Sequence, residues 1–304
     1  MQRIIVIVGP TAIGKTDLAA KLAKKIKGEI ISADSMQGYK EMDIISQKPP
    51  LKLRKEISHH LVDFLDPDDE YNAAKFARLA EKKIKEIIKR KKIPVIVGGS
   101  GLYVRALIDG IFSSPGKNLT LRRRLQNIAS TKGPEHLHNM LKEIDPDSAS
   151  KIHKNDVKKT IRAIEIYEHG KKTKTDLKKS TKGIKNKYNV EITGLTAERD
   201  KLYSMINKRV DKMFKKGIIE EARKLLTHHL SITSRQALGI KEIKGYLDNE
   251  YDIETAKELL KKNTRRFAKR QLTWFRQDLS IKWFDIDKVS QNDIMEEIWN
   301  GRSS

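Results

Sequence analysis

The chain contains no cysteine. Disulfides, thiolate catalysis, iron–sulfur clusters and cysteine-ligated zinc are therefore excluded. Long hydrophobic runs are also missing, because the longest, Ile4 to Val8 and Pro94 to Val97, fall far short of the ~18–20 residues that a membrane-spanning helix needs. The N-terminal run ends in Gly-Pro, which is unlike a secretory signal. We therefore expect a cytoplasmic protein with no membrane partner.

Acidic residues are few relative to basic ones. The 304 residues include 63 Lys and Arg against 40 Asp and Glu, a formal net charge of +23. An excess of this size favours association with polyanions, although solvated helix faces in a lysine-rich protein account for part of it. Residues 151–190 hold 13 basic and 4 acidic residues, a local net charge of +9.

A second basic stretch, Lys261 to Arg276, holds seven basic residues and no acidic one, together with Phe267, Trp274 and Phe275. Basic side chains pair with phosphates, and aromatic rings offer stacking faces for bases. The rings equally fit the buried side of a helix. The basic residues are therefore the stronger part of this signal for nucleic-acid binding.

Strands and helices alternate in the first hundred residues. Apolar runs beginning at Arg3, Glu29 and Ile93 predict strands, and residues 16–26 and 71–92 predict helices. This alternation indicates an α/β fold, a P-loop-type core with a mostly parallel sheet flanked by helices. Ligands of such a sheet bind at the carboxyl ends of its strands.

The middle of the chain, about residues 113–187, is polar, basic and helical in pattern. We predict that it forms a helical insertion domain between two segments of the core, residues 1–112 and 188–304. Residues 189–195 and 281–287 read as further strands of the core sheet.

The segment GPTAIGKT, between the first predicted strand and the first predicted helix, matches the Walker A pattern. Its glycines let backbone N–H groups turn inward around phosphate oxygens, and the following helix adds its positive end. Lys15 supplies a point charge, and the Thr16 hydroxyl can be placed on Mg²⁺. The predicted phosphate-binding residues are Gly9, Pro10, Thr11, Ala12, Ile13, Gly14, Lys15 and Thr16.

Asp34, at the end of the second predicted strand, reaches the same rim of the sheet as Lys15. A carboxylate beside a phosphate site is either a metal ligand, as in kinases, or a general base that deprotonates a nucleophile. The local pattern does not separate these roles. His59, His60 and Asp63 form only a weak metal-binding pattern, and we predict no metal there.

Taken together, these motifs resemble the bacterial tRNA dimethylallyltransferase family over nearly the whole chain. The matching segments, in the family's order, are GPTAIGKT, ISADSMQGY, MDI…KP, HHLVDFLDP, PVIVGGSGLY, HKNDVKKTIRAIEIY, INKRVDKM, QALGIKE and AKRQLTWFR. The resemblance implies transfer of a dimethylallyl group from dimethylallyl diphosphate to N6 of the adenosine 3′ of the anticodon, in tRNAs that read codons beginning with U. The phosphate loop then holds a leaving group, and Mg²⁺ is the implied cofactor.

The resemblance also implies roles for individual residues. Asp34 matches the family's catalytic aspartate, and Arg209 falls at its arginine position near the diphosphate, so the implied catalytic set is Asp34, Lys15, Thr16 and Arg209. Arg199 is a weaker candidate for binding the same diphosphate. The implied tRNA contacts are Asp34, Ser35, Met36, Gln37, Ser100, Arg122, Lys158, Lys159, Thr160, Ile161, Arg162, Gln236, Ala237, Leu238, Gly239, Ile240, Lys241, Lys269, Arg270, Gln271, Thr273, Trp274 and Arg276.

The chain departs from the family pattern at a few positions. Gly38 stands where a bulkier residue is common, ISQKP replaces GTAKP, Ser100 replaces threonine and Ile240 replaces tyrosine. Serine keeps the hydroxyl, whereas Ile240 has no ring with which to contact RNA. None of these departures alters Lys15, Thr16 or Asp34.

Two other function classes fit the phosphate loop: an isopentenyltransferase that acts on free adenine nucleotides, and a P-loop nucleotide kinase or non-catalytic RNA-binding NTPase. A small nucleotide substrate would not need the basic helical regions, which favour the anticodon stem-loop of tRNA as the partner. We see no heptad seam and expect a monomer.

Overall fold

The structure is a computed structural model that describes residues 1–112, 116, 118–179 and 181–301. It divides into a core unit, Met1–Ile108 with Ile184–Ser304, and a helical unit, Asp109–Gly183. The helical unit begins and ends four residues earlier than the predicted insertion, 113–187, because Ile184 is already packed in the hydrophobic core of the core unit. Residues 113–115 and 117, at the start of the predicted insertion, lie outside the described residues.

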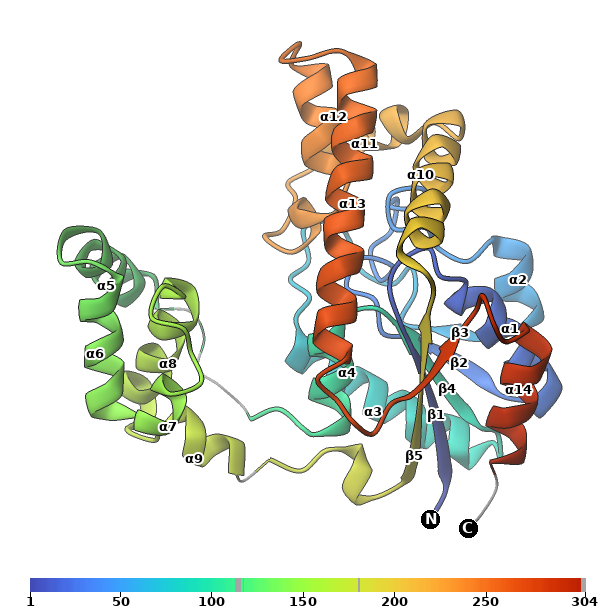
Figure 1. The fold of residues 1–304 in the computed structure, drawn as a ribbon, viewed down its shortest axis with the longest axis horizontal. Helices are drawn as coiled ribbons and strands as arrows, with labels where there is room; N and C mark the ends of the chain where they lie inside the picture. The colour runs from blue at the N-terminus through green and yellow to red at the C-terminus, as the bar shows by residue number, and fades with distance from the viewer. Residues whose placement is uncertain (113–115, 117, 180, 302–304) are drawn as a thin grey trace. The chain divides into compact units, whose positions relative to one another are not determined.

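Among the described residues, six strands form one sheet in the order β3-β2-β4-β1-β5-β6, and every neighbouring pair is parallel (Figure 1). The predicted α/β class with a parallel sheet is confirmed. The two-residue strand β3 was not predicted, because so short a segment carries no periodicity. The strands are β1 (Arg3–Val8), β2 (Glu29–Ser32), β3 (His59–His60), β4 (Pro94–Gly98), β5 (Asn189–Thr196) and β6 (Lys282–Asp285).

Strand β1 is apolar throughout because both faces of the sheet are covered. Ile4, Val6 and Val8 point into the core cluster that holds residues of α3 (Ala73–Lys89) and α4 (Gly101–Ile108). The alternate residues Ile5 and Ile7 point into the cluster with α1 (Lys15–Ile26) and α14 (Gln291–Asn300). The sheet is thus enclosed by helices, and its carboxyl edge stays available for ligands.

Further helices of the core unit extend beyond the carboxyl ends of the strands (Figure 1). The long helix α13 packs against α10 and α12, and its C-terminal part approaches α4. Helices α10 (Arg199–Lys215) and α13 (Ile253–Phe275) line the edge of the sheet where the sequence motifs meet. The other helices of the core unit are α2 (Leu51–Glu56), α11 (Ile218–Leu226) and α12 (Ile240–Leu247), with short 3₁₀ turns at Ile184–Asn186 and Ser234–Gln236.

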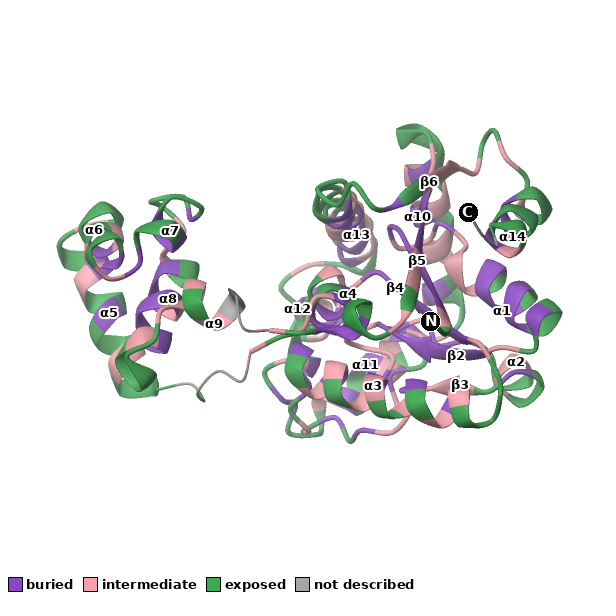
Figure 2. Ribbon diagram, turned by 90° about the horizontal axis from the view of Figure 1, so that it is seen from below, coloured by how far each residue is buried: buried purple, intermediate pink, exposed green. Residues whose placement is uncertain are grey.

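The helical unit has a small hydrophobic core of its own, as Figure 2 shows by the buried sides of its helices. Leu125, Leu137, Leu141 and Ile164 are the centre of this core. The helical character predicted for the insertion is therefore present. Its helices are α5 (Leu119–Thr131), α6 (Pro134–Ile144), α7 (Pro146–Ala149), α8 (Val157–Gly170) and α9 (Lys174–Lys179).

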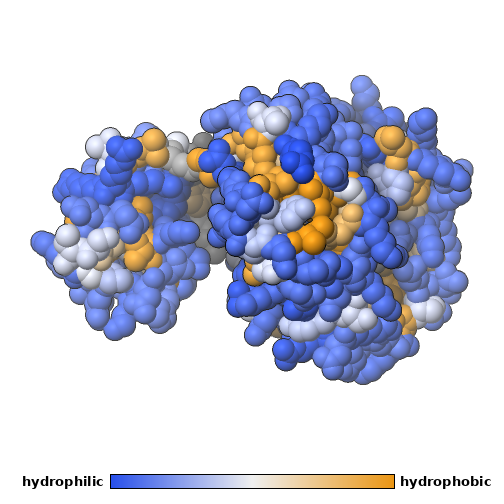
Figure 3. Space-filling view, turned by 90° about the horizontal axis from the view of Figure 1, so that it is seen from above, coloured by the Kyte–Doolittle hydropathy of each residue, from blue (hydrophilic) through white to orange (hydrophobic). Residues whose placement is uncertain are grey.

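Hydrophilic residues dominate the surface seen in Figure 3, and on the core unit the hydrophobic residues of this face gather in a band between them. In the part of the chain that the structure describes, every helix is too short or too polar to span a bilayer.

Candidate active site

A cavity of about 820 Å³ opens in the core unit, at the carboxyl ends of β1, β2 and β4. Its floor comes from the phosphate loop, the segment Asp34–Gln37 and the turn Gly98–Ser100. Its walls come from α10, α13 and the segment Gln236–Leu238. Motifs that are far apart in the sequence therefore meet in one place, as the parallel sheet predicts.

The phosphate loop has the backbone conformation of an anion cradle. Gly9 and Gly14 have φ of 146° and 91°, and a Cβ atom on Gly9 would lie 2.7 Å from the Leu195 carbonyl oxygen. The N–H groups of Lys15 and Thr16 lie in the first turn of α1, where a helix offers no internal acceptor. These donors and the positive helix end together attract an anion.

Lys15 and Arg209 place two partly desolvated cations beside this cradle. Burial lowers the pKa of Lys15 to about 7; nearby Arg209 acts in the same direction and Asp34 opposes it. Burial likewise lowers the pKa of Arg209 to about 10, again opposed by Asp34. Lys15 Nζ donates a hydrogen bond of 2.6 Å to the Pro10 carbonyl oxygen, within the loop itself. Positive charge thus exceeds negative charge at this end of the cavity, which favours an anionic ligand.

Asp34 is held with one carboxylate oxygen engaged. Its Oδ1 accepts hydrogen bonds from the N–H groups of Met36, at 2.8 Å, and Gln37, at 3.4 Å, while Oδ2 accepts none from the residues that the structure describes. Ser100 Oγ accepts a hydrogen bond of 3.2 Å from the Ser35 N–H, which joins the ends of β2 and β4. Asp34 lines the cavity with an oxygen left to accept a proton.

Gln271 supports the phosphate loop. Its Oε1 accepts a hydrogen bond of 2.8 Å from the Thr11 N–H, and its Nε2 donates one of 3.0 Å to the Gly99 carbonyl oxygen. A Cβ atom on Gly99 would lie 2.1 Å from that Nε2, so only glycine allows the contact. Gln271 also lines the cavity, and its predicted RNA contact stays a prediction.

The other predicted residues of the core unit fall into three groups. Those that line the cavity are Ser35, Met36, Gln37, Ser100, Gln236, Ala237, Leu238 and Arg270. Those exposed on the core unit outside the cavity are Lys241, Lys269, Thr273, Trp274 and Arg276. Ile240 follows Gly239 at the start of α12 and is 2% exposed, so its predicted RNA contact is corrected to packing in the core.

Arg199 lies outside the cavity, with its guanidinium 5.2 Å from the centre of the Tyr203 ring. Ten residues of helix α10 separate it from Arg209, which is about 15 Å at the rise of an α-helix. The prediction that Arg199 binds the diphosphate is corrected for this reason.

Comparison with known proteins agrees with this geometry. The family model described as IPP transferase matches residues 37–278, more than half of the chain. The chain belongs to the IPP transferase family.

Individual relatives match over nearly the whole of this chain. A curated protein of Halothermothrix orenii named tRNA dimethylallyltransferase is 49% identical over 97% of this chain and 91% of its own. A crystal structure of the tRNA isopentenylpyrophosphate transferase of Bacillus halodurans matches with a TM-score of 0.72 and 40% identity, covering 99% of this chain and 95% of that one. A eukaryotic dimethylallyltransferase solved while acting on tRNA matches with a TM-score of 0.80 and 27% identity, over 100% of this chain and 81% of that one.

In this member of the IPP transferase family, three lysines at the cavity were missed by sequence reasoning. Lys208, Lys212 and Lys216 line it from α10 and its C-terminal end, and the structure gives them no ion pair with a described residue. Their spacing of four residues places them on one face of the helix. That spacing of four in the sequence was the available signal.

The predicted RNA-binding residues of the helical unit are partly engaged within that unit. Glu165 is buried and binds both Arg122 and Arg162; Arg122 donates bonds of 2.8 and 2.7 Å to its two oxygens. Burial alone would raise the pKa of Glu165, but the hydrogen bonds from both arginines lower it to about 2. Thr160 and Ile161, at 0% and 6% exposed, are corrected from RNA contacts to core residues of this unit.

Lys158 and Lys159 are exposed at the start of α8 in the helical unit. Lys159 pairs with Asp156 at 2.7 Å, one turn away. Among the predicted contacts of this unit, these two lysines present their charge most openly to a polyanion.

No cluster of three or more His, Cys, Asp or Glu side chains suited to a metal occurs among the described residues. His60 binds Glu29 at 2.7 Å, and Asp63 binds Lys48, so neither is left for a metal. The Thr16 hydroxyl, at the cavity, fits Mg²⁺. Mg²⁺ is commonly held by one or two protein oxygens together with substrate phosphates and water, and Thr16 suits that arrangement.

Proposed function

We propose that this protein transfers the dimethylallyl group of dimethylallyl diphosphate to N6 of the adenosine 3′ of the anticodon, in tRNAs that read codons beginning with U. The products are the N6-dimethylallyladenosine of the tRNA and diphosphate. The observation that carries the proposal is the meeting of the phosphate loop, Lys15, Arg209 and Asp34 in one cavity. A location in the cytoplasm, where the protein would meet tRNA, suits this activity.

The phosphate loop binds the leaving group. As the bond between C1 of the dimethylallyl group and the diphosphate oxygen breaks, its electron pair passes to the diphosphate. Backbone N–H groups of the loop, Lys15 and Arg209 stabilise the charge that develops there. The Thr16 hydroxyl would hold Mg²⁺, which would supply additional charge neutralisation at the diphosphate.

Asp34 receives the proton of the nucleophile. The lone pair of adenine N6 is delocalised into the ring, so the amine is a poor nucleophile until it begins to lose a proton. As N6 bonds to C1, its proton moves to Asp34 Oδ2, the oxygen not held by the Met36 and Gln37 N–H groups. One C–O bond breaks, one C–N bond forms, and the proton ends on the carboxylate.

The adenine reaches this cavity because it lies in a single-stranded loop. An anticodon-loop base can be splayed from its stack at lower cost than a base in a duplex. Ser35, Met36 and Gln37 line the cavity beside Asp34 and are placed to meet the base.

The test combines the purified protein with Mg²⁺, labelled dimethylallyl diphosphate and unmodified tRNA, with AMP and ATP in parallel reactions. We expect label on the tRNA adenosine 3′ of the anticodon. Label on AMP or ATP alone would instead assign a free-nucleotide prenyltransferase. Phosphate transfer from ATP, without a need for dimethylallyl diphosphate, would assign a kinase.

Asp34→Asn tests the general base. The amide keeps the shape of the side chain but cannot take the proton, so we expect turnover to fall by about 10²- to 10⁴-fold while tRNA affinity changes only a few-fold. Asp68→Asn, at an exposed carboxylate outside the cavity, is the matched control. Normal turnover of Asp34→Asn would rule out Asp34 as the base.

A further inference from the structure

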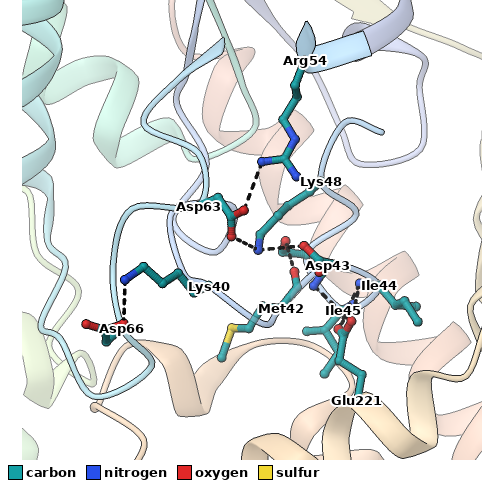
Figure 4. Close-up of polar contacts among 11 residues, drawn as sticks. Lys40, Met42, Asp43, Ile44, Ile45, Lys48, Arg54, Asp63, Asp66 and Glu221 are labelled. Carbon is teal, nitrogen blue, oxygen red and sulfur yellow. Dashed lines mark hydrogen bonds and ion pairs between the residues drawn. The ribbon is translucent and has the colours of Figure 1, made fainter. Parts of the chain in front are cut away.

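Part of the cavity lining comes from a turned segment, Asp43–Lys48, which overlaps the MDI…KP motif but to which neither the sequence analysis nor the mechanism assigns a role. Ile45, Ser46, Gln47 and Lys48 all line the cavity. Backbone bonds from Gln47 N–H to the Ile44 carbonyl and from Lys48 N–H to the Asp43 carbonyl shape the turn. The segment is neither helix nor strand, so its position depends on the side chains that hold it (Figure 4).

Glu221, in the first turn of α11, holds the beginning of this segment (Figure 4). Its Oε2 accepts hydrogen bonds from the N–H groups of Asp43, at 3.0 Å, and Ile44, at 2.7 Å. Its Oε1 accepts from Ile44, at 2.9 Å, and from Ile45, at 2.7 Å. A single carboxylate thus binds three consecutive backbone N–H groups, which is the geometry of an anion nest.

Lys48 holds the other end of the segment. Its side chain is 2% exposed, and its Nζ lies 2.9 Å from Asp43 Oδ1 and 2.7 Å from Asp63 Oδ1. Arg54 pairs with the second oxygen of Asp63 at 3.2 Å. The segment is therefore fixed at its beginning by hydrogen bonds to Glu221 and at its end by the ion pairs of the buried Lys48, as Figure 4 shows.

The segment is also joined to the part of the cavity that holds Asp34. Gln37 Nε2 donates a hydrogen bond of 3.3 Å to the Gln47 carbonyl oxygen, and Gln37 Oε1 accepts one of 2.8 Å from Ser32 Oγ. Gln47 itself has a left-handed backbone, with φ of 53°, and its amide donates to the Ile44 carbonyl at 2.6 Å. A displacement of the segment at Ile44 would therefore move the acceptor that orients the Gln37 amide.

We propose that Glu221 is a positioning residue for the base-binding side of the cavity: it fixes the segment Asp43–Lys48 and, through Gln47, sets the orientation of Gln37 toward the incoming adenine. The inference rests on the proposed function. The hydrogen bonds that the structure gives Glu221 come from backbone N–H groups of the segment. Its effect should therefore fall on the tRNA substrate and spare dimethylallyl diphosphate, whose proposed site is the phosphate loop.

Glu221→Gln tests this role. The amide offers one acceptor oxygen and turns its NH₂ group toward N–H donors, so at least one backbone N–H of the segment loses its partner. We expect kcat/KM for tRNA to fall about 10- to 100-fold, since displacements near 1 Å have effects of this size, while KM for dimethylallyl diphosphate stays within about twofold. Glu220→Gln is the matched control. Glu220 is exposed on the same helical turn, and its substitution removes the same charge from the start of α11.

A double-mutant cycle with Gln37→Ala separates positioning from general stability. If Glu221 acts through Gln37, the single variants lower kcat/KM for tRNA and the double variant is little worse than either. Losses of kcat/KM that multiply fully in the double variant would overturn the proposal. So would a lowered melting temperature of Glu221→Gln with unchanged kcat/KM for tRNA, or an equal loss of kcat/KM for tRNA and for dimethylallyl diphosphate. Absence of transfer to tRNA by the unaltered protein would refute the proposed function instead, so the two failures are distinguishable.

Discussion

Lys15 lies where its own charge is disfavoured until a ligand arrives. Burial and the neighbouring Arg209 lower its pKa to about 7, against an ordinary value of 10.5. The unfolded chain therefore holds this proton more tightly than the folded protein does. An anionic ligand at the phosphate loop supplies the missing negative charge. In the proposed function, Lys15 therefore lowers the stability of the ligand-free protein and stabilises the bound diphosphate.

This reasoning predicts how pH changes the stability of the ligand-free protein. Between pH 7 and 10.5 the unfolded state binds more protons than the folded state at Lys15, so this residue makes stability rise with pH across that window. Lys15→Met removes the effect. We expect the variant to melt at a higher temperature than the unaltered protein at pH 7, where each ~1 kcal/mol corresponds to about 2 °C or more, and the difference to shrink toward pH 10.

Thermal unfolding of both proteins, followed by circular dichroism across that pH range, is the measurement. Lys21→Met, at an exposed lysine on the same helix, is the control and should show no such pH-dependent gain. A variant that is less stable at every pH would contradict the assignment of Lys15 as a strained cation.

At the scale of the element, helix α10 and its C-terminal end contribute three lysines to the cavity lining as well as Arg209. Lys208, Lys212 and Lys216 repeat like charge at intervals of four residues, which costs an isolated helix ~0.2–0.5 kcal/mol per pair. The negative end of the helix offsets part of this cost for Lys212 and Lys216. It does not reach Lys208, about two turns from the C-terminus of the helix. We therefore expect Lys208, Lys212 and Lys216 to contact phosphates of the tRNA along this face of the helix while the base lies in the cavity.

Replacing all three lysines by glutamine should weaken tRNA binding at low salt and reduce the slope of log affinity against log salt by about 2–3, because each lost phosphate contact removes about one. KM for dimethylallyl diphosphate should change little. The triple variant of Lys82, Lys85 and Lys89 on α3 removes the same net charge from an outer helix, away from the cavity, and is the control. Equal losses in the two triple variants would mean that only overall charge matters.

At the scale of the whole molecule, basic charge is present in both units. Most of the +9 segment at residues 151–190 lies in the helical unit, and the basic run Lys261–Arg276 lies on α13 of the core unit. We expect tRNA to contact both, since an elongated polyanion neutralises several lysines and arginines at once.

Affinity for tRNA should therefore fall steeply with salt, with a log–log slope of several. Lys158→Gln with Lys159→Gln in the helical unit, and Lys269→Gln with Arg276→Gln in the core unit, should each lower the slope by about 1–2 and should do so additively. Equilibrium binding of labelled tRNA between about 50 and 200 mM salt is the measurement. A flat salt dependence would refute the electrostatic contact, and an effect confined to one pair would assign binding to that unit alone.

Local patterns were enough to predict much of this protein. The strands β1, β2 and β4, the phosphate loop and the helices α1 and α3 follow from short-range periodicity and turn chemistry, which each segment carries within itself. The order of motifs along the chain then placed Lys15, Thr16 and Asp34 at one edge of a parallel sheet, where the structure has them. The short strand β3 has no such signal, and the predicted RNA contacts at Thr160, Ile161 and Ile240 failed because position in a motif does not report which side of a helix is buried.

What the sequence determined by itself was therefore the fold class and the helical character of the middle of the chain, since neighbours along the chain suffice for these. The same local pattern predicts the chemistry of the phosphate loop, which stays a prediction. Only the tertiary structure decided the supporting contacts. Gln271 reaches Thr11 across 260 residues, and Glu221 reaches Ile44 across 177. From the sequence alone, a glutamine or a glutamate on a helix is expected to face solvent. Only the folded chain brings the partner backbone next to it. The folded chain brings α11 to the segment Asp43–Ile45 and α13 to the phosphate loop, so these two side chains become supports of the cavity.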